Sequence, residues 1–254
     1  MFDFHGRVAL ISGGSSGIGL LFAHALAERG AELVLIARRK AKLEAAAAEV
    51  AEKHGVRVLP VVCDVTDPAM VDACRETVER EFGRCDILVN CAGAGHNDWA
   101  LELSDEKWTA TMDVCLTGLF RMCREFAKLM KANNYGRIIN ISSMLGSVAL
   151  DSTFGRGICE YSAAKGGVIN LTRQLANEWA QYGITVNTLS PGFFASEQSP
   201  VGQGWFNDFL HTWCPMKRAG RNSELDAAII FMASEENSYM TGSNIVIDGG
   251  WTCT

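Results

Sequence analysis

Tyr161 and Lys165 are two side chains whose spacing suits proton transfer. The i, i+4 spacing places both on one face of a helix. A free tyrosine has a pKa of about 10 and is a poor acid–base catalyst near neutrality, but a nearby ammonium stabilises the phenolate and lowers that pKa. Tyr161 could then donate a proton to a carbonyl oxygen as a hydride arrives, or remove one from an alcohol. Isolated pairs of this kind are mostly surface or packing pairs, so other motifs must decide whether this pair is catalytic.

A hydroxyl group stands before this helix in the chain. Ser142 and Ser143 end a predicted strand, and the Ser143 hydroxyl could hold a substrate oxygen beside the tyrosine. The alternative is a strand end capped by local serine–backbone hydrogen bonds. Met144 and Leu145 follow the serine and are predicted to line the substrate cleft.

A glycine-rich turn near the N-terminus predicts a dinucleotide site, because it follows a strand and opens a helix. Glycines let the backbone approach a pyrophosphate, whose charge is favoured at a helix N-terminus. The spacing G-x-x-x-G-x-G differs from the commoner G-x-G-x-x-G, and a simple tight connection is the alternative. The cofactor contacts predicted from this turn are Gly13, Ser15, Ser16, Gly17, Ile18 and Gly19.

The next strand indicates which nicotinamide cofactor is bound. A carboxylate roughly 20 residues beyond the turn would hold the ribose hydroxyl of NAD, but Ala37 stands there, followed by Arg38, Arg39 and Lys40. Cations at a helix N-terminus oppose the macrodipole, and a 2′-phosphate gripped by arginine would relieve that cost. A solvated basic face is the alternative for Arg39 and Lys40. We predict NADP(H) as the preferred cofactor, with Arg38 as its main contact and Arg39 beside it, and NAD(H) as possible.

Two further strand ends offer cofactor contacts, since ligands of doubly wound sheets bind at the carboxyl ends of the strands. Asp64 and Val65 end the third strand, where a carboxylate could meet the adenine amino group. The fourth strand ends in Asn90, Ala92 and Gly93, which are small enough to lie against a cofactor. Neither motif is specific alone.

Short β-branched runs alternate with helical patterns along the whole chain, which predicts a parallel sheet with helices on both faces. The expected fold class is α/β, a single Rossmann-type doubly wound parallel sheet of about seven strands. One domain, 1–254, carries cofactor binding and catalysis, with a substrate lid at about 191–222. The predicted strands are Val8–Ser12, Leu33–Ala37, Arg57–Cys63, Asp86–Asn90, Arg137–Ser142, Thr185–Ser190 and Asn244–Ile247; the predicted helices span 16–29, 40–54, 67–82, 104–132, 160–182 and 223–233.

Composition narrows the class of protein. A net charge of −6 gives no overall attraction for nucleic acid or an anionic membrane. We expect no signal peptide, because the N-terminus lacks a basic region followed by an apolar run, and no membrane span. Nine cysteines without a C-x-x-C pair suggest reduced thiols in a cytoplasmic protein, and the scattered histidines suggest no metal site.

In their order along the chain, these motifs resemble the short-chain dehydrogenase/reductase family. The resemblance covers nearly all of the chain and implies catalytic roles for Ser143, Tyr161 and Lys165. It also implies cofactor contacts by Tyr161, Lys165, Pro191, Gly192 and Phe193, with the peptide around residue 193 near the nicotinamide carboxamide. Asn187 and the closing Asp248-Gly249-Gly250-Trp251 match later landmarks of the family. The stretch Tyr161–Phe194 and the closing Asp-Gly-Gly-Trp-Thr are most similar to gluconate 5-dehydrogenase-type members.

Three features depart from the family pattern. Cys115 stands where the family usually has an asparagine that supports a proton relay through water, which puts the relay, but not the core chemistry, in doubt. The segment between Ser143 and Tyr161 is a few residues longer than usual, and its added part, about 151–160, should border the active site. Phe193 and Phe194 follow Pro191-Gly192 where a cofactor-binding threonine is common.

These features favour an NADP(H)-dependent oxidoreductase that interconverts a ketone and a secondary alcohol. The resemblance implies a homo-oligomer, a dimer or tetramer. The alternatives are a catalytically silent nucleotide-binding protein, which the intact Ser143, Tyr161 and Lys165 oppose, and an epimerase or dehydratase of the same fold.

Large apolar residues after the sixth strand bear on the substrate. Four of them recur at helical spacing, and they either pack a lid or line a pocket. We expect Phe194, Trp205 and Phe206 to contact a bulky apolar or cyclic, steroid-like ketone. The alternative is a sugar acid, whose carboxylate needs a cation such as Arg156, Lys217, Arg218 or Arg221. The residues of this stretch are Phe193, Phe194, Trp205, Phe206, Phe209, Leu210 and Trp213.

Overall fold

Seven parallel strands form one sheet, as the sequence predicts, and their order in the sheet is β3-β2-β1-β4-β5-β6-β7. This computed structural model describes residues 2–196 and 199–253. The strand order reverses at β1, between β2 and β4, which is where doubly wound sheets bind their ligands. The strands are β1 (Val8–Ser12), β2 (Glu32–Ala37), β3 (Val58–Val62), β4 (Ile87–Asn90), β5 (Gly136–Ile141), β6 (Ile184–Pro191) and β7 (Asn244–Ile247).

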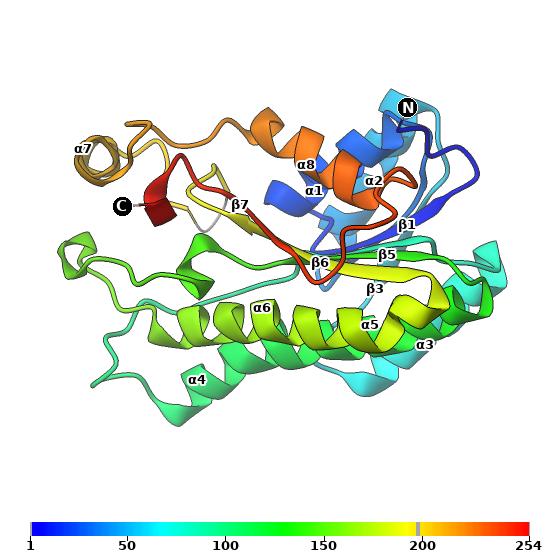
Figure 1. Cartoon of the computed structure of the whole chain (residues 1–254), viewed down its shortest axis with the longest axis horizontal. Coiled ribbons are helices and arrows are strands. Elements are labelled where there is room, and N and C mark those ends of the chain that lie inside the picture. Colours follow the sequence, from blue (N-terminus) through cyan, green and yellow to red (C-terminus); the bar gives the residue numbers. More distant parts are fainter. Residues whose placement is uncertain (1, 197–198, 254) are drawn as a thin grey trace.

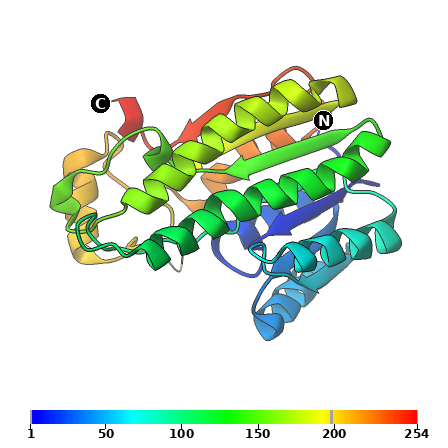
Figure 2. The same ribbon diagram turned by 90° about the horizontal axis from the view of Figure 1, so that it is seen from below.

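Helices cover both faces of the sheet (Figure 1). One face carries α1 (Gly17–Ala27), α2 (Lys40–His54) and α8 (Asp226–Ala233). The other carries α3 (Pro68–Phe82), α4 (Asp105–Met112), α5 (Leu119–Ala132) and α6 (Cys159–Trp179), and Figure 2 shows these from below, with α6 and α5 side by side across the strands.

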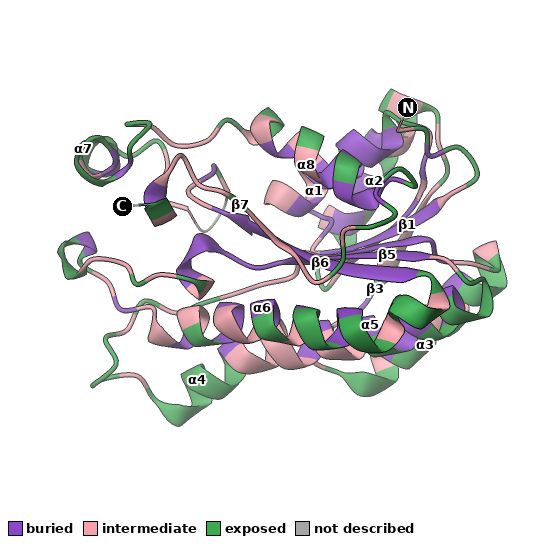
Figure 3. Cartoon of the chain, viewed as in Figure 1, coloured by how far each residue is buried: buried purple, intermediate pink, exposed green. Residues whose placement is uncertain are grey.

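Alternating side chains of the strands supply two separate cores. In β1, Ala9 and Ile11 pack toward α1, α2 and α8, whereas Val8 and Leu10 pack toward α3, α5 and α6. Figure 3 shows buried residues along the strands and exposed residues on the outer sides of the helices. The buried sheet fixes the strand ends from which the site is built.

The helix predicted over 104–132 is present, but it is not α-helical throughout. The structure has α4, then a π-helix over Asp113–Gly118, then α5. At Gly118 an added Cβ would lie 2.8 Å from Cγ2 of Val65 and 2.9 Å from the Asp113 carbonyl oxygen. The wider π-helical turn therefore ends at a residue, Gly118, that packs closely against Val65 in the loop after β3. The apolar pattern runs through it without a break, so it gives no sign of the interruption, and π-turns of this kind often mark functional sites.

The segment after β6 contains α7 (Gly204–Trp213), which confirms the helix predicted from the spacing of Phe206, Phe209, Leu210 and Trp213. In Figure 1, α7 lies beside the C-terminal end of the chain, where β7 is followed by a short 3₁₀ helix over Trp251–Cys253. The predicted helix at 223–233 begins as a 3₁₀ turn, Asn222–Leu225, before α8.

All nine cysteines are free, and six of them are buried. Across residues 2–196 and 199–253, no three His, Cys, Asp or Glu side chains are grouped so that they could hold a metal ion. Within the same described residues, no helix combines the length and the apolar character that a membrane crossing needs.

Candidate active site

Ser143, Tyr161 and Lys165 come together at the carboxyl end of β5 and the start of α6. The Ser143 side chain lies close enough to the Tyr161 phenol to lower its pKa by hydrogen bonding. The Lys165 ammonium lies 5.4 Å from the centroid of the Tyr161 ring and donates a 2.7 Å hydrogen bond to the Ile141 carbonyl oxygen. The structure therefore assembles the predicted hydroxyl, phenol and ammonium in one place.

Burial and neighbouring charges act in opposite directions on the pKa values of Tyr161 and Lys165. Burial raises the pKa of Tyr161 above its usual value, and the positive charge of Lys165 and the hydrogen bond from Ser143 offset only part of the rise. Burial alone would lower the pKa of Lys165, but attraction to Tyr161, Cys115 and Cys91 outweighs it, and the pKa is raised. Lys165 is thus an ammonium and Tyr161 a neutral phenol near neutrality, which is the form that donates a proton.

The glycine turn is shaped for close approach. An added Cβ at Gly19 would lie 2.4 Å from the Gly13 carbonyl oxygen, and one at Gly13 would lie 3.1 Å from Cα of Ala92. Ser15 is buried, and Ser16 precedes α1 without a side-chain cap. The first N–H groups of a helix have no intrahelical partners, so those of Gly17, Ile18 and Gly19 are placed to bind an anion.

Ser12, at the end of β1, contributes a contact that the sequence does not single out. Its Oγ accepts hydrogen bonds from the backbone N–H groups of Cys91 (3.0 Å) and Ala92 (3.1 Å). This joins the glycine turn to the loop after β4. A lone serine at a strand end is too common a feature to predict such a bridge.

Arg38 and Asp64 lie side by side at the ends of β2 and β3. Their closest charged atoms, Nη1 and Oδ2, are 3.9 Å apart, and the Arg38 side chain is 69% exposed. Oδ1 of Asp64 accepts hydrogen bonds from the backbone and hydroxyl of Thr66, whereas Val65 is buried. An exposed pair at this distance holds its arginine weakly, so Arg38 can turn to a phosphate. Arg39 is the N-cap residue of α2.

Asn90 points into the interior of the protein. Its Nδ2 donates to Oδ1 of Asn140 (2.9 Å), whose own Nδ2 donates to the Thr172 hydroxyl (2.9 Å). Ala92 and Gly93 follow at the surface of the site, and an added Cβ at Gly93 would lie 3.6 Å from Nζ of Lys165. The Asn90 side chain thus braces β4, β5 and α6, while the next residues border the catalytic lysine.

Cys115 lies in the π-helix and is fully buried. Its Sγ donates to the Ala94 carbonyl oxygen at 3.1 Å and accepts from the Ala94 N–H at 3.5 Å. An added Cβ at Gly93 would lie 3.7 Å from this Sγ. The thiol therefore clamps the loop after β4 through Ala94.

Most of the predicted substrate residues pack against one another. The buried ones are Met144, Leu145, Phe194 and Phe206, whereas Trp205 is 44% exposed and donates from Nε1 to Gln203. An aromatic cluster surrounds Phe206 and includes Phe154 of the longer segment before Tyr161, which sequence reasoning missed. Its members are Phe154, Phe193, Trp205, Phe206, Phe209, Trp213 and Trp251. Phe194 points instead toward α8 and the Gly220 backbone.

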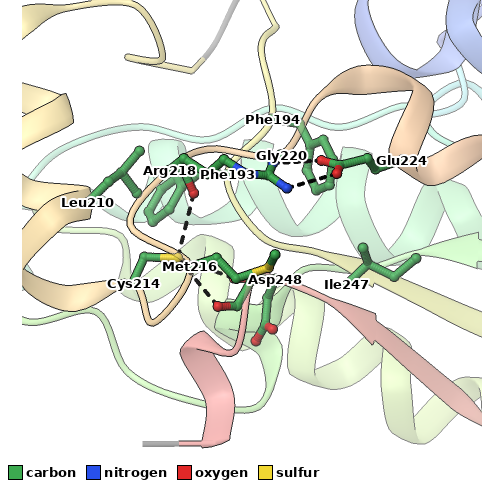
Figure 4. A pocket seen from close by; sticks show the side chains of 11 residues that line it. Phe193, Phe194, Leu210, Cys214, Met216, Arg218, Gly220, Glu224, Ile247 and Asp248 are labelled. Atoms are coloured by element: carbon green, nitrogen blue, oxygen red, sulfur yellow. Dashed lines mark hydrogen bonds and ion pairs between the residues drawn. The ribbon is translucent and has the colours of Figure 1, made fainter.

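A small cavity of about 140 Å³ lies behind Phe193 and Phe194 (Figure 4). Arg218 and Glu224 form a two-pronged ion pair across it, at 2.8 and 2.9 Å. Arg221 also bonds Glu224. Ser143, Tyr161 and Lys165 are not among the residues lining this cavity, so it is separate from the catalytic group.

An open cleft of about 860 Å³ lies between the loop after Ser143 and the end of α7. Val148 and Leu150 on one wall pack against the same buried cluster as Tyr161, and Trp251 on the other contacts Phe193 with 5.4 Å between ring centroids. Ser143, Tyr161 and Lys165 do not line this cleft either, but its apolar wall residues share one buried cluster with Tyr161. The cleft is lined by Val148, Ala149, Leu150, Asp151, Ser152, Thr212, Trp213, Pro215, Lys217 and Trp251.

Comparison with known proteins gives the class. Residues 13–252 match a family model described as enoyl-(acyl carrier protein) reductase. D-threitol dehydrogenase of Mycolicibacterium smegmatis is 38% identical over 99% of this chain and 95% of its own length. Galactitol 2-dehydrogenase (L-tagatose-forming) of Cereibacter sphaeroides is 38% identical over 99% and 97%. The chain belongs to the short-chain dehydrogenase/reductase family and is an oxidoreductase of that family.

A solved structure shares the whole fold. Gluconate 5-dehydrogenase from Burkholderia cenocepacia, in complex with NADP and tartrate, superposes with a TM-score of 0.93 at 36% identity, covering 100% of this chain and 98% of that one. The resemblance to gluconate 5-dehydrogenase-type members predicted from the sequence is thus confirmed at the level of related structures.

Proposed function

We propose that this protein is an NADP(H)-dependent oxidoreductase that interconverts a ketone and a secondary alcohol on a polyhydroxylated substrate. The observation that carries the proposal is the contact between Ser143 and Tyr161 with the Lys165 ammonium 5.4 Å from the phenol ring. A hydroxyl, a protonated phenol and a fixed positive charge are what carbonyl reduction requires of the protein.

The residues present fit a dinucleotide. The close contacts at Gly13 and Gly19 leave a surface that side chains would fill, and α1 has no acidic residue in its first turn. When bound, the nicotinamide supplies or accepts the hydride. Arg38 favours the 2′-phosphate of NADP(H), because a cation and not a carboxylate follows β2.

Three side chains of the protein bind the substrate oxygen and transfer its proton. Ser143 holds the substrate oxygen, and Tyr161 donates its proton to that oxygen during reduction. Lys165, held by the Ile141 carbonyl, stabilises the phenolate that remains. In alcohol oxidation each transfer runs in reverse.

The cleft supports a polar substrate more than a steroid-like one. Phe206, at the centre of the aromatic cluster, and the neighbouring Leu210 are almost fully buried, so their apolar surfaces pack inside the protein and do not face a substrate. The open cleft instead presents Asp151, Ser152 and Thr212 beside Trp213, a mixture that suits hydroxyl groups on a carbon chain. The named relatives that act on threitol, galactitol and gluconate point the same way.

A substrate panel tests the proposal. Wild-type protein is assayed with NADPH and NADH against a neutral ketose, a keto-sugar acid and a bulky cyclic ketone, through nicotinamide absorbance. We expect the highest kcat/KM for a polyhydroxylated ketone with NADPH. A preference for the bulky ketone would restore the apolar alternative, and absence of any carbonyl reduction would overturn the proposed reaction. The lid role of residues 191–222, a homo-oligomeric state and a cytoplasmic location stay predictions.

A further inference from the structure

Glu160, the residue before Tyr161, is a completely buried carboxylate. Its Oε1 accepts a 2.9 Å hydrogen bond from the His96 N–H. Its Oε2 has no hydrogen-bond partner among the described residues. Burying a carboxylate with so few partners costs free energy, and a buried polar group left partly unsatisfied calls for a reason. This side chain takes no part in the proposed proton transfer.

The loop that Glu160 holds runs over the catalytic group. Three polar groups fix this loop: Ser12 Oγ holds the N–H of Cys91 and Ala92, Cys115 Sγ holds Ala94, and Glu160 holds the His96 N–H. Gly95, between the last two anchors, lies against the phenol ring, where a larger residue would be crowded, since an added Cβ there would lie 3.2 Å from Cδ2 of Tyr161.

The segment that carries Glu160 packs against the same loop at a second point. At Gly157 an added Cβ would lie 2.0 Å from the Asp98 carbonyl oxygen. The backbone of the segment before Tyr161 therefore touches the loop at Asp98, and the Glu160 side chain secures it at His96.

We infer that Glu160 is a positioning residue, which holds the loop through the His96 N–H so that Gly95 fixes the Tyr161 ring for proton transfer. The inference rests on the proposed role of Tyr161 as proton donor. It requires a hydrogen-bond acceptor at Glu160 and not a negative charge. A misplacement of the phenol by about 1 Å would be enough to slow the reaction strongly.

Two substitutions of similar size separate these requirements. Glu160→Gln keeps an acceptor oxygen and removes the charge, whereas Glu160→Met removes both. We expect E160Q to keep kcat within about threefold and its pH profile unmoved, and E160M to lose kcat by about ten- to a hundredfold. The KM for NADPH should stay unchanged in both, and the melting temperature of E160M should fall by no more than about 5 °C, because an apolar side chain of similar volume replaces a poorly paired charge.

Hydrogen–deuterium exchange of the peptide covering residues 93–98 supplies a readout that needs no turnover. Exchange should speed up in E160M and match wild type in E160Q. Wild-type kcat in E160M, or equal loss of kcat in both variants, would overturn the inference. If E160M does not fold, faster exchange or lost activity in E160Q still contradicts it. If no carbonyl is reduced by wild type, the exchange result stands apart from the failure of the proposed function.

Discussion

The ammonium of Lys165 donates a 2.7 Å hydrogen bond to the carbonyl oxygen of Ile141, two residues before Ser143. A second bond runs the other way, from the Ser142 hydroxyl to the Lys165 carbonyl oxygen at 2.7 Å. Together they lock the end of β5 to the second turn of α6. The serine, which comes from the strand, and the tyrosine, which comes from the helix, are thereby held at a fixed separation.

Arg38 should decide the choice between the two nicotinamide cofactors. Arg38→Ala is expected to raise the KM for NADPH at least about tenfold while leaving that for NADH almost unchanged, because only NADPH carries the 2′-phosphate. A charge-assisted hydrogen bond is worth about 1.5–3 kcal/mol, and about 1.4 kcal/mol corresponds to tenfold in binding. KM values for both cofactors check this, with Lys53→Met, exposed at the far end of α2, as control. A wild-type preference for NADH would contradict the assignment.

Cys115 should be replaceable by a residue that can both donate and accept a hydrogen bond. Cys115→Asn is expected to keep kcat within about threefold, because its amide can serve both groups of Ala94. Cys115→Ala removes both bonds, each worth about 1 kcal/mol, and should lower kcat by roughly tenfold as the loop loosens. Steady-state kinetics beside melting curves separate this effect from unfolding. Equal activity in both variants would show that the thiol only fills space.

The raised pKa of Tyr161 gives the two reaction directions opposite pH dependence. Below that pKa the phenol is protonated, so reduction should be insensitive to pH from about 6 to 9. Oxidation needs the phenolate, so its kcat/KM should rise about tenfold per pH unit over the same range. The test is to measure both directions across this range. An oxidation rate that levels off near neutrality would mean that the positive charge of Lys165 outweighs burial.

Lys217 should discriminate between acidic and neutral substrates. It is the one cation among the described residues that line the open cleft, and its Nζ makes a single long contact, 3.5 Å to the Thr212 carbonyl oxygen. Lys217→Met is expected to lower kcat/KM for a keto-sugar acid about tenfold and to leave a neutral ketose unaffected. The control is again Lys53→Met. Equal losses for both substrates would mean that Lys217 stabilises the lid and does not recognise the substrate carboxylate.

Much of this arrangement could be predicted from the sequence, because the buried parallel strands leave a clear periodic signal. The ends of β1, β4 and β5 fall within one or two residues of the predicted ends, and those ends carry the glycine turn, Ala92 and Ser143. Helical spacing places Tyr161 and Lys165 on one face, and the neighbouring motifs mark this pair as catalytic. Such features are local, so a single sequence contains them.

Features that depend on tertiary contacts could not be predicted. The π-helix around Cys115 accompanies close packing at Gly118. The inward orientation of the Asn90 side chain depends on its hydrogen bond to Asn140, fifty residues later. The aromatic stretch gave the correct helix, α7, but its spacing could not show that Phe206 would be buried by Phe154. The burial of Glu160 has no sequence signal, since an acidic residue in the first turn of a helix is usually exposed.

Tyr161→Phe tests the central claim, that this phenol is the proton donor in an NADPH-dependent reduction. The substitution keeps the ring that packs against Gly95 and removes only the hydroxyl. We expect kcat for the best ketone of the panel to fall by about 10²–10⁴-fold, while NADPH binding and the melting temperature stay at wild-type values. A Tyr161→Phe protein that retains more than about a tenth of wild-type kcat would contradict the account.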